Sequence, residues 1–363
     1  MASSNLPFSV RSLLELVDAS LPEDRLIGQL SHPVLGRSFL ESPFDLDADS
    51  LSDLIYRLTQ IAYNRYPRLG LCDLEDRIHT WHGLGEESAV MGANGGFQIL
   101  DLVLQMLAFR SEPRVLLNSP DFYAFDDLCK KHKISPRLLS LDIANNLNQA
   151  LDEITSFGPD LLMISNPNNP TGLHLDQNSL ARLVAEVPGL VLVDETYFAF
   201  APDHAMSLLS RFNNLLICRS FSKTGLAAIR FGYLCGFSPV INSIKRFRLP
   251  FPVNSMTIAA ANFVVDNPRV LYENARKIIA LRESMRERLN AIRGCECYPS
   301  ATNFLVVRLS GHDVIDVAKK LISDGIPVRP YVNIPILSDC IRLDVMDELG
   351  NDFAMERIKY WIS

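Results

Sequence analysis

Short apolar runs that alternate with helix-like stretches are the feature that most constrains the fold of this chain. The runs are apolar along their whole length, as strands buried on both faces of a sheet are. Between them, Leu175–Val187 keeps the apolar spacing of a helix, with Asp176 as its expected N-cap. The alternation predicts an α/β fold with a mainly parallel central sheet covered by helices. The expected strands are Arg114–Asn118, Arg137–Leu141, Asp160–Ser165, Leu190–Asp194, Leu215–Arg219 and Gly232–Gly236.

The pattern changes after about residue 250, where Pro250 and Pro252 interrupt the chain. The elements expected beyond this point are a helical stretch from Ile258 to about Ile292 broken at Pro268, a strand at Asn303–Leu309, a helix near Val314–Ser323 and a strand at Cys340–Val345. We therefore expect a large domain at residues 46–250. Residues 251–363 would form an interdomain helix and a smaller α+β domain, and residues 1–45 an arm that contributes to that smaller domain.

Composition excludes several classes of protein. The chain has 363 residues, which suggests two domains, and its 48% hydrophobic content is too high for general disorder. With 35 basic and 42 acidic residues the net charge is −7, which argues against nucleic acid as the main partner. The apolar runs are far shorter than the roughly 18 residues of a membrane-spanning helix. We therefore expect neither a nucleic-acid nor a membrane partner.

The seven cysteines indicate a reducing compartment, because an odd number in a chain of this length does not suggest a disulfide framework. Cys295 and Cys297 are two residues apart, without the accompanying spacing of a metal site, so no metal is expected. The first residues, Met1–Pro7, lack the basic and then apolar pattern of a signal peptide. These features together predict a cytoplasmic protein.

Polar residues follow two neighbouring predicted strands, at the edge where ligands bind in such sheets. Ser165–Gly172 is a constrained loop rich in asparagine and proline, which is either a tight turn or a support for an amide donor to a cofactor oxygen. Asp194 ends the next strand, where an acid is costly unless it meets a cation or donors, although it could also cap a helix. Tyr197 offers a phenol three residues later.

Two further segments complete the pattern. Lys223 lies among hydroxyl and small residues after another strand, where a lysine can form a Schiff base with an aldehyde cofactor, although most single lysines are surface charges. Gly92–Gly96 precedes an apolar helix pattern at Phe97–Phe109, and such a turn suits a phosphate or is simply a helix start. An aldehyde, a pyridine nitrogen, a phenolate oxygen and a phosphate together describe pyridoxal phosphate (PLP).

The order and spacing of these motifs resemble those of a known family. Asn-Asn-Pro-Thr-Gly at 168–172, Asp-x-x-Tyr at 194–197 and Ser-x-Ser-Lys at 220–223 are similar to PLP-dependent aminotransferases of fold type I, most closely the histidinol-phosphate aminotransferase branch. The resemblance runs from Asn64–Pro67 to Ile341–Leu343, about three quarters of the chain. It implies a large PLP-binding domain, a smaller domain and a homodimer.

The resemblance implies catalytic roles for Lys223, Asp194 and Tyr197 and a cofactor-binding role for Asn169. Lys223 would hold PLP through a Schiff base and later move the proton at the substrate's Cα. Asp194 would keep the ring nitrogen protonated, so that the ring accepts electrons from that carbon. Asn169 and Tyr197 would bind the ring oxygen and lower the pKa of the Schiff base.

The resemblance also implies how the rest of the cofactor is held. Phe122 would stack on the ring, where relatives carry tyrosine or another aromatic residue. Tyr66 would reach a phosphate across the dimer interface. The other phosphate contacts would be the backbone at Asn94 and Gly95, the hydroxyls of Ser220 and Ser222, and Arg230, although the interval from Lys223 to Arg230 is one residue shorter than usual.

Three residues are candidates for substrate binding. Arg342 would clamp the substrate's α-carboxylate, a bidentate task that suits guanidinium. Arg329 occupies a place where histidinol-phosphate enzymes bind the substrate's own anion, and it could equally be a surface arginine. The segment Leu30–Gly36 replaces the family's Asn-Glu-Asn-Pro stretch, which makes His32 a candidate near the reacting carbons, although a lone histidine is more often structural.

Three functions remain open at this point. The first is transamination of an amino acid or related amine. The second is another PLP reaction on the same scaffold, namely elimination, replacement, cyclisation or decarboxylation, which the altered segment around His32 motivates. The third is a ligand-binding or regulatory relic, which is disfavoured because Lys223 and Asp194 are both present.

Overall fold

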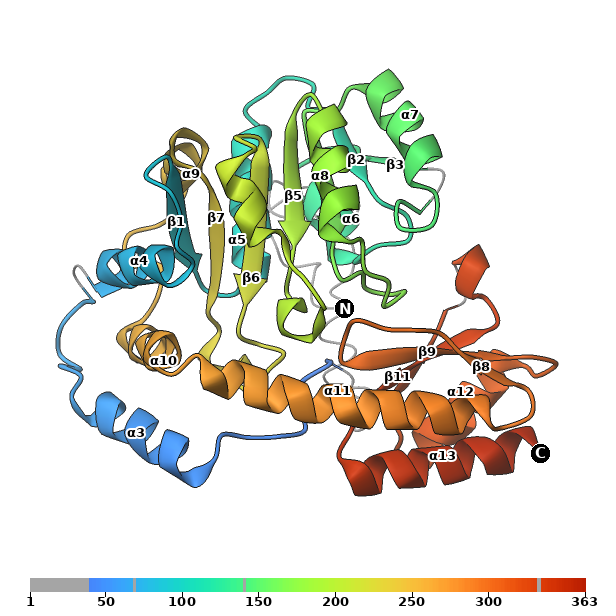
Figure 1. The fold of residues 1–363 in the computed structure, drawn as a ribbon. Coiled ribbons are helices and arrows are strands. Elements are labelled where there is room, and N and C mark those ends of the chain that lie inside the picture. Colours follow the sequence, from blue (N-terminus) through green and yellow to red (C-terminus); the bar gives the residue numbers. More distant parts are fainter. Residues whose placement is uncertain (1–38, 68–69, 140–141, 332–333) are drawn as a thin grey trace, which may run out of the picture.

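The computed structural model describes residues 39–67, 70–139, 142–331 and 334–363. Its largest element is a seven-stranded sheet with the order β1-β7-β6-β5-β4-β2-β3 (Figure 1). Strands β3, β2, β4, β5 and β6 pair in parallel, whereas β7 runs antiparallel to both β6 and β1. The predicted mainly parallel sheet is confirmed. Its strands are β1 (Ser88–Ala93), β2 (Val115–Leu117), β3 (Arg137–Leu138), β4 (Leu161–Ser165), β5 (Leu190–Asp194), β6 (Leu215–Ser220) and β7 (Gly232–Phe237).

Six of these strands were predicted, and burial explains all of them except β3, which is exposed. Successive residues of β4 alternate between two cores, with Leu162 and Ile164 facing one and Leu161 and Met163 facing the other. Both faces are therefore covered, and the four residues before Ser165 are apolar. Strand β1 was not predicted, because Ser88–Ala93 is rich in small residues with low strand propensity and is held by pairing with β7.

Helices cover both faces of this sheet. Helices α5, α6 and α9 pack on one face, and α4, α7, α8 and α10 on the other. In α8, the predicted N-cap is confirmed, since the Asp176 carboxylate accepts bonds from the backbone N–H groups of Asn178 and Ser179, both at 3.0 Å. The helices are α3 (Ala48–Thr59), α4 (Gly70–Trp81), α5 (Gly96–Leu107), α6 (Ala124–Lys131), α7 (Leu147–Phe157), α8 (Gln177–Glu186), α9 (Ser238–Lys245) and α10 (Ser255–Asp266).

A second, four-stranded antiparallel sheet has the order β10-β11-β9-β8 and its own core. Its elements are α11 (Arg269–Asn290), β8 (Cys295–Cys297), β9 (Phe304–Leu309), α12 (Val314–Ser323), β10 (Val328–Pro330), β11 (Cys340–Asp344) and α13 (Glu348–Ile362). Figure 1 shows the long helix α11 running from the large sheet to this smaller one, where it packs on β8, β9 and α13. The predicted helix break at Pro268, between α10 and α11, is confirmed.

The first described residue of the N-terminal arm is Phe39. Leu40 is buried in the core of the smaller sheet, and the carbonyl oxygen of Leu40 accepts a bond from the Asn303 side chain at 2.7 Å. The proposed domain limits at residues 45 and 250 stay a prediction.

None of the helices in the described ranges combines the length and the apolar character needed to cross a membrane. All seven cysteines lie within those ranges, and none is in a disulfide.

Candidate active site

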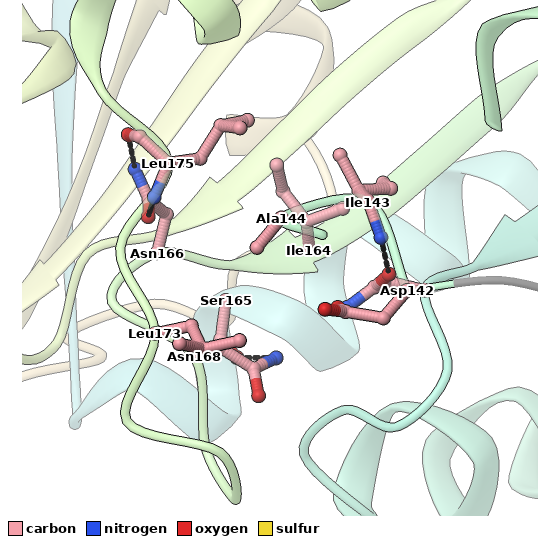
Figure 2. Close-up of a pocket in the computed structure, with 10 residues that line it drawn as sticks. Asp142, Ile143, Ala144, Ile164, Ser165, Asn166, Asn168, Leu173 and Leu175 are labelled. Atoms are coloured by element: carbon pink, nitrogen blue, oxygen red, sulfur yellow. Dashed lines mark hydrogen bonds between the residues drawn. The ribbon is translucent and has the colours of Figure 1, made fainter. Parts of the chain in front are cut away.

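A cavity of about 490 Å³ lies where the carboxyl ends of the parallel strands face the smaller sheet. A second cavity, behind the loop at Asn166–Leu175, measures only about 20 Å³ and has room for about one water molecule (Figure 2). The larger cavity is therefore the candidate active site. The predicted site residues that line it are Phe122, Asn169, Asp194, Tyr197, Ser220, Ser222, Lys223, Arg230, Arg329 and Arg342.

Lys223 lies in the turn after β6. Its Nζ donates a hydrogen bond to the carbonyl oxygen of Phe39 at 2.7 Å and lies 5.9 Å from the centroid of the Tyr197 ring. Burial, together with the charge of Arg342, lowers the pKa of Lys223 to about 8. A lysine of this kind holds a substantial neutral fraction near neutral pH, which makes it a better nucleophile than a surface lysine.

Asp194 ends β5, on the strand next to the one that leads to Lys223. Its carboxylate is buried and accepts bonds from the backbone N–H and the hydroxyl of Thr196. Burial raises the pKa of Asp194, and the Thr196 bonds and the nearby Lys223 oppose that rise. A cation within the cavity would offset the cost of this buried charge.

The loop after β4 places Asn169 in the cavity, where its side-chain Nδ2 lies 3.4 Å from the Tyr197 hydroxyl as a donor. Two other asparagines hold the loop itself. Oδ1 of Asn166 accepts from the backbone N–H of Leu175 at 2.8 Å, and its Nδ2 donates to the carbonyl oxygen of Leu175 at 2.9 Å (Figure 2). The side-chain Nδ2 of Asn168 donates to the Ser165 hydroxyl. The interpretation as a tight turn is therefore confirmed, and a bond from Asn169 to a cofactor oxygen stays a prediction.

The predicted phosphate-binding residues meet at the start of α5. Gly95 has φ +85°, and a Cβ there would lie 2.9 Å from Nη2 of Arg230, so only glycine fits this position without displacement. The hydroxyls of Ser220 and Ser222 are 2.7 Å apart, and Nη1 of Arg230 donates to Ser222 at 3.5 Å. The shorter interval between Lys223 and Arg230 therefore still brings this arginine to the site.

The residues that line the cavity at this helix start lie two positions after the predicted ones. The N–H of Asn94 donates to the Gln98 side chain at 2.7 Å, and the N–H of Gly95 donates to the carbonyl of Ala93 at 2.9 Å. The residues that line the cavity are the next two, Gly96 and Phe97. The signal for them is that α5 begins at Gly96, since the first turn of a helix directs its N–H groups outward. Phosphate contacts by Asn94 and Gly95 stay a prediction.

Two arginines form the wall contributed by the smaller sheet. Arg329 and Arg342 are paired across β10 and β11, so their side chains share one face. Arg342 is buried, with its guanidinium 5.4 Å from the Phe304 ring centroid and 3.7 Å from the Asp344 carboxylate. Arg329 lies 5.6 Å from the Tyr123 ring centroid. Of the two alternatives for Arg329, this position at the cavity favours a site residue over a surface arginine, and its binding of a substrate anion stays a prediction.

The remaining predicted residues have different placements. The Phe122 ring lies at the cavity wall, with edge contacts to Phe97 at 5.5 Å and to Phe125 at 5.8 Å. Tyr66 is 74% exposed, stacks on Phe251 with ring centroids 4.7 Å apart, and does not line the cavity of this protomer. His32 lies outside the described residues.

The donor set of this cavity fits PLP group by group. The buried amine of Lys223 suits an aldehyde, and the buried carboxylate of Asp194 suits a protonated ring nitrogen. The hydroxyls of Ser220 and Ser222, with the guanidinium of Arg230, suit a phosphate. Within the described ranges, no group of three or more histidine, cysteine or acidic side chains is arranged to hold a metal ion.

Comparisons with known proteins show the family of this chain. The family model described as "Aminotransferase class I and II" matches residues 49–358. The chain is 32% identical over 309 residues to a histidinol-phosphate aminotransferase from Chromobacterium violaceum, covering 84% of this chain and 86% of the relative. It is 29% identical over 323 residues to histidinol-phosphate aminotransferase 2 from Nitrosococcus oceani, covering 88% and 89%.

Solved structures share the fold. Histidinol-phosphate aminotransferase from Sinorhizobium meliloti in complex with pyridoxal-5'-phosphate has a TM-score of 0.81 at 22% identity, over 95% of this chain and 96% of that one. L-threonine-O-3-phosphate decarboxylase from Porphyromonas gingivalis has a TM-score of 0.75 at 20% identity, over 90% and 98%. The family match spans most of the sequence, and the chain therefore belongs to the aminotransferase class I and II family as a PLP-dependent aminotransferase of fold type I.

Proposed function

We propose that this enzyme transfers the amino group of an amino acid or amino alcohol that carries an anionic group, in the manner of histidinol phosphate. The observation that carries the proposal is that Lys223, Asp194 and Arg342 meet in one buried cavity. The names of the curated relatives support the substrate class. Another PLP reaction on the same scaffold has no comparable support, although a decarboxylase shares the fold.

Lys223 and Asp194 have the central proposed roles. Bound PLP supplies an aldehyde that takes up the amino group and a ring that withdraws electrons from the substrate's Cα. Lys223 would hold that aldehyde, and its amine would take and return the proton at Cα. Its pKa of about 8 suits both tasks near neutral pH. Asp194 keeps a proton on the ring nitrogen, because a buried carboxylate is stabilised by a cation at its side.

The other proposed roles concern orientation. Asn169 and Tyr197 donate hydrogen bonds to the ring oxygen, and Phe122 packs on the ring. The residues proposed for the phosphate are Asn94, Gly95, Ser220, Ser222 and Arg230. Arg342 binds the substrate's carboxylate or equivalent anion, and Arg329 binds a second anion.

We further propose a homodimer in the cytoplasm, with Tyr66 shared across the interface. The stacked pair of Tyr66 and Phe251 is exposed at 74% and 50%, and Leu249, exposed at 74%, lies nearby in the sequence. Large exposed apolar side chains of this kind support a contact with a second subunit. The interface would bury these side chains and bring Tyr66 to the partner's cavity.

The test of the proposed reaction is a half-reaction screen. The PLP-loaded protein is mixed with single amino donors, including donors with phosphate or cationic side chains. Transamination predicts loss of the visible PLP absorbance, formation of pyridoxamine phosphate and a matching keto acid or aldehyde by mass spectrometry. If no donor yields pyridoxamine phosphate, the proposal fails. Loss of water or carbon dioxide without a carbonyl product would support the alternative class of elimination or decarboxylation.

The lowered pKa of Lys223 predicts how PLP loading depends on pH. Only the neutral amine attacks an aldehyde. The loading rate of the PLP-free protein should therefore rise with pH through about 8 and then level, instead of rising near the 10.5 of an ordinary lysine. The rate is measured by rapid-mixing absorbance over a pH series. A midpoint near 10.5 would show that the pKa of Lys223 is not lowered.

Replacing Arg342 by lysine tests the anion clamp. The charge remains but the bidentate geometry is lost, so KM for the preferred donor should rise about 10- to 100-fold with a smaller change in kcat. Arg308→Lys is the matched control, because Arg308 is paired with Glu296 and Asp339 on the outside of β9. Equal KM values for the Arg342 and Arg308 variants would exclude the clamp.

A further inference from the structure

A buried carboxyl group, that of Asp121, lies at the cavity wall and has no role in the proposed function. It follows β2 and immediately precedes Phe122. Its oxygens accept bonds from the backbone N–H of Phe122 at 2.7 Å, the backbone N–H of Ser165 at 3.2 Å and the side-chain Nδ2 of Asn118 at 3.1 Å. The hydroxyl of Ser165 also bonds this carboxylate. Four donor groups therefore converge on one acid.

The orientation of these donors is fixed by their other bonds. The Oδ1 atom of Asn118 accepts from the backbone N–H of Ile143 at 3.1 Å, so its NH₂ group faces Asp121. Figure 2 shows Ile143 and its bond at this position. An amide turned the other way would place its NH₂ group against the N–H of Ile143. Asn118 is therefore a donor to Asp121 and cannot act as an acceptor there.

The hydroxyl of Ser165 is fixed in the same way. Its oxygen accepts from the backbone N–H of Asn169 at 3.1 Å and from the Nδ2 of Asn168 at 3.3 Å. The Asn168 amide cannot be reversed, because its Oδ1 accepts from the backbone N–H and hydroxyl of Thr171 at 3.0 and 2.7 Å. Both acceptor positions of the Ser165 oxygen are thus used, and its single proton goes to Asp121. The surroundings of Asp121 are those of a carboxylate and would not suit a carboxamide.

These bonds join two parts of the cofactor site. Oδ1 of Asp121 accepts from the backbone N–H of Phe122 and from the hydroxyl of Ser165, whose oxygen in turn accepts from the backbone N–H of Asn169. Asn169 in turn donates to Tyr197 at 3.4 Å. Burial raises the pKa of Asp121 to about 7, although the hydrogen bonds from the four donors lower it. Ionising the acid here therefore costs free energy.

We propose that Asp121 is a positioning residue, whose carboxylate sets the place of Asn169 and Phe122 relative to the cofactor through the Asp121–Ser165–Asn169 connection. The proposal rests on the proposed function, because Asn169 and Phe122 are its proposed contacts to the ring oxygen and the ring face. A residue that merely supported the fold would affect unfolding alone. A positioning residue also affects the bound cofactor.

Two substitutions break the connection at different points. Asp121→Asn keeps the shape of the side chain but turns an NH₂ group toward at least one of the donors. Ser165→Ala leaves the carboxylate in place and removes the link to Asn169. Asp126→Asn is the matched control, because Asp126 lies five residues later on α6 and its carboxylate pairs with Lys130 at the surface.

The experiment measures three quantities for each PLP-loaded protein. These are the dissociation constant of PLP, the pKa of the visible absorbance of lysine-bound PLP, and the unfolding temperature of the PLP-free form. For Asp121→Asn and Ser165→Ala we expect PLP to bind about tenfold more weakly, as on losing one hydrogen bond to a charged group. The spectral pKa should rise by about half a unit to one unit, because the ring oxygen loses a well-placed donor.

The outcomes separate this inference from the proposed function. A rise of the spectral pKa in both variants, with Asp126→Asn unchanged, supports the positioning role. A lower unfolding temperature in both variants with an unchanged spectral pKa and PLP affinity overturns it. If Asp121→Asn does not fold, Ser165→Ala alone decides between these two results. A wild-type protein without any lysine-bound PLP absorbance overturns the proposed function, and this inference with it.

Discussion

Lys223→Ala is expected to reduce the rate of transamination by at least about 10³-fold and to remove the visible absorbance of lysine-bound PLP. The variant loses both the amine that binds the aldehyde and the group that moves the proton at Cα. No other cation in the described part of the site can take over these tasks. The others that line the cavity are the arginines Arg230, Arg329 and Arg342, which do not give up a proton at neutral pH. Steady-state kinetics and an absorbance spectrum measure both effects.

Two controls make this result specific. Lys223→Arg keeps the positive charge but has no primary amine, so it should fail to the same degree. Lys277→Ala removes an exposed lysine that lies 5.4 Å from the Phe44 ring centroid, and it should leave turnover unchanged. A Lys223→Ala protein that retained normal turnover and absorbance would disprove the assignment of the catalytic lysine.

Asp194→Ala is expected to lower kcat by about 10²- to 10³-fold, which is the usual cost of removing one preorganised charge partner from an active site. The ring nitrogen would lose its proton, and the ring would then withdraw electrons from Cα poorly. The expected signature is a fall in kcat with a much smaller change in KM. Reconstitution with a PLP analogue methylated at the ring nitrogen, which keeps the positive charge without a proton, should recover part of the rate.

The neighbouring acid, Glu195, provides the contrast. Its carboxylate is 1% exposed and pairs with the guanidinium of Arg219 at 2.8 Å, and it also accepts from the backbone of Ala205. Glu195→Ala would leave Arg219 buried without this partner, so the free energy of unfolding should fall by about 3–5 kcal/mol. Denaturant unfolding and kinetics on the folded fraction separate the two acids. A larger loss of kcat in folded Glu195→Ala than in Asp194→Ala would reverse the assignment.

The fold could be predicted where burial imposes a simple pattern. Strands β4, β5 and β6 each begin with four apolar residues because both faces of the sheet are covered, and their polar residues come only at the carboxyl ends. Strands β1, β8 and β10 could not be predicted, because they are short or rich in small residues and are held by pairing with their neighbours. The propensity of such segments is weak, and tertiary contacts decide their conformation.

The site was predictable where a residue follows a strand directly. Lys223, Asp194 and Asn169 all lie at carboxyl ends of parallel strands, so the topology brings them together. Asp121 could not be assigned from the sequence, because its significance depends on bonds to Ser165 on another strand. The motif assigned the site role to Asp194, but the pairing of Glu195 was hidden, since only the direction of its side chain takes it away from the cavity to the buried Arg219.

The most direct test of the account is to identify the lysine that holds PLP. The PLP-loaded protein is treated with borohydride, which fixes the linkage, and is then digested and analysed by tandem mass spectrometry. We expect one phosphopyridoxyl group, on the peptide that contains Lys223. Labelling of a different lysine, or a Lys223 peptide that remains unmodified while the protein is active, would contradict it.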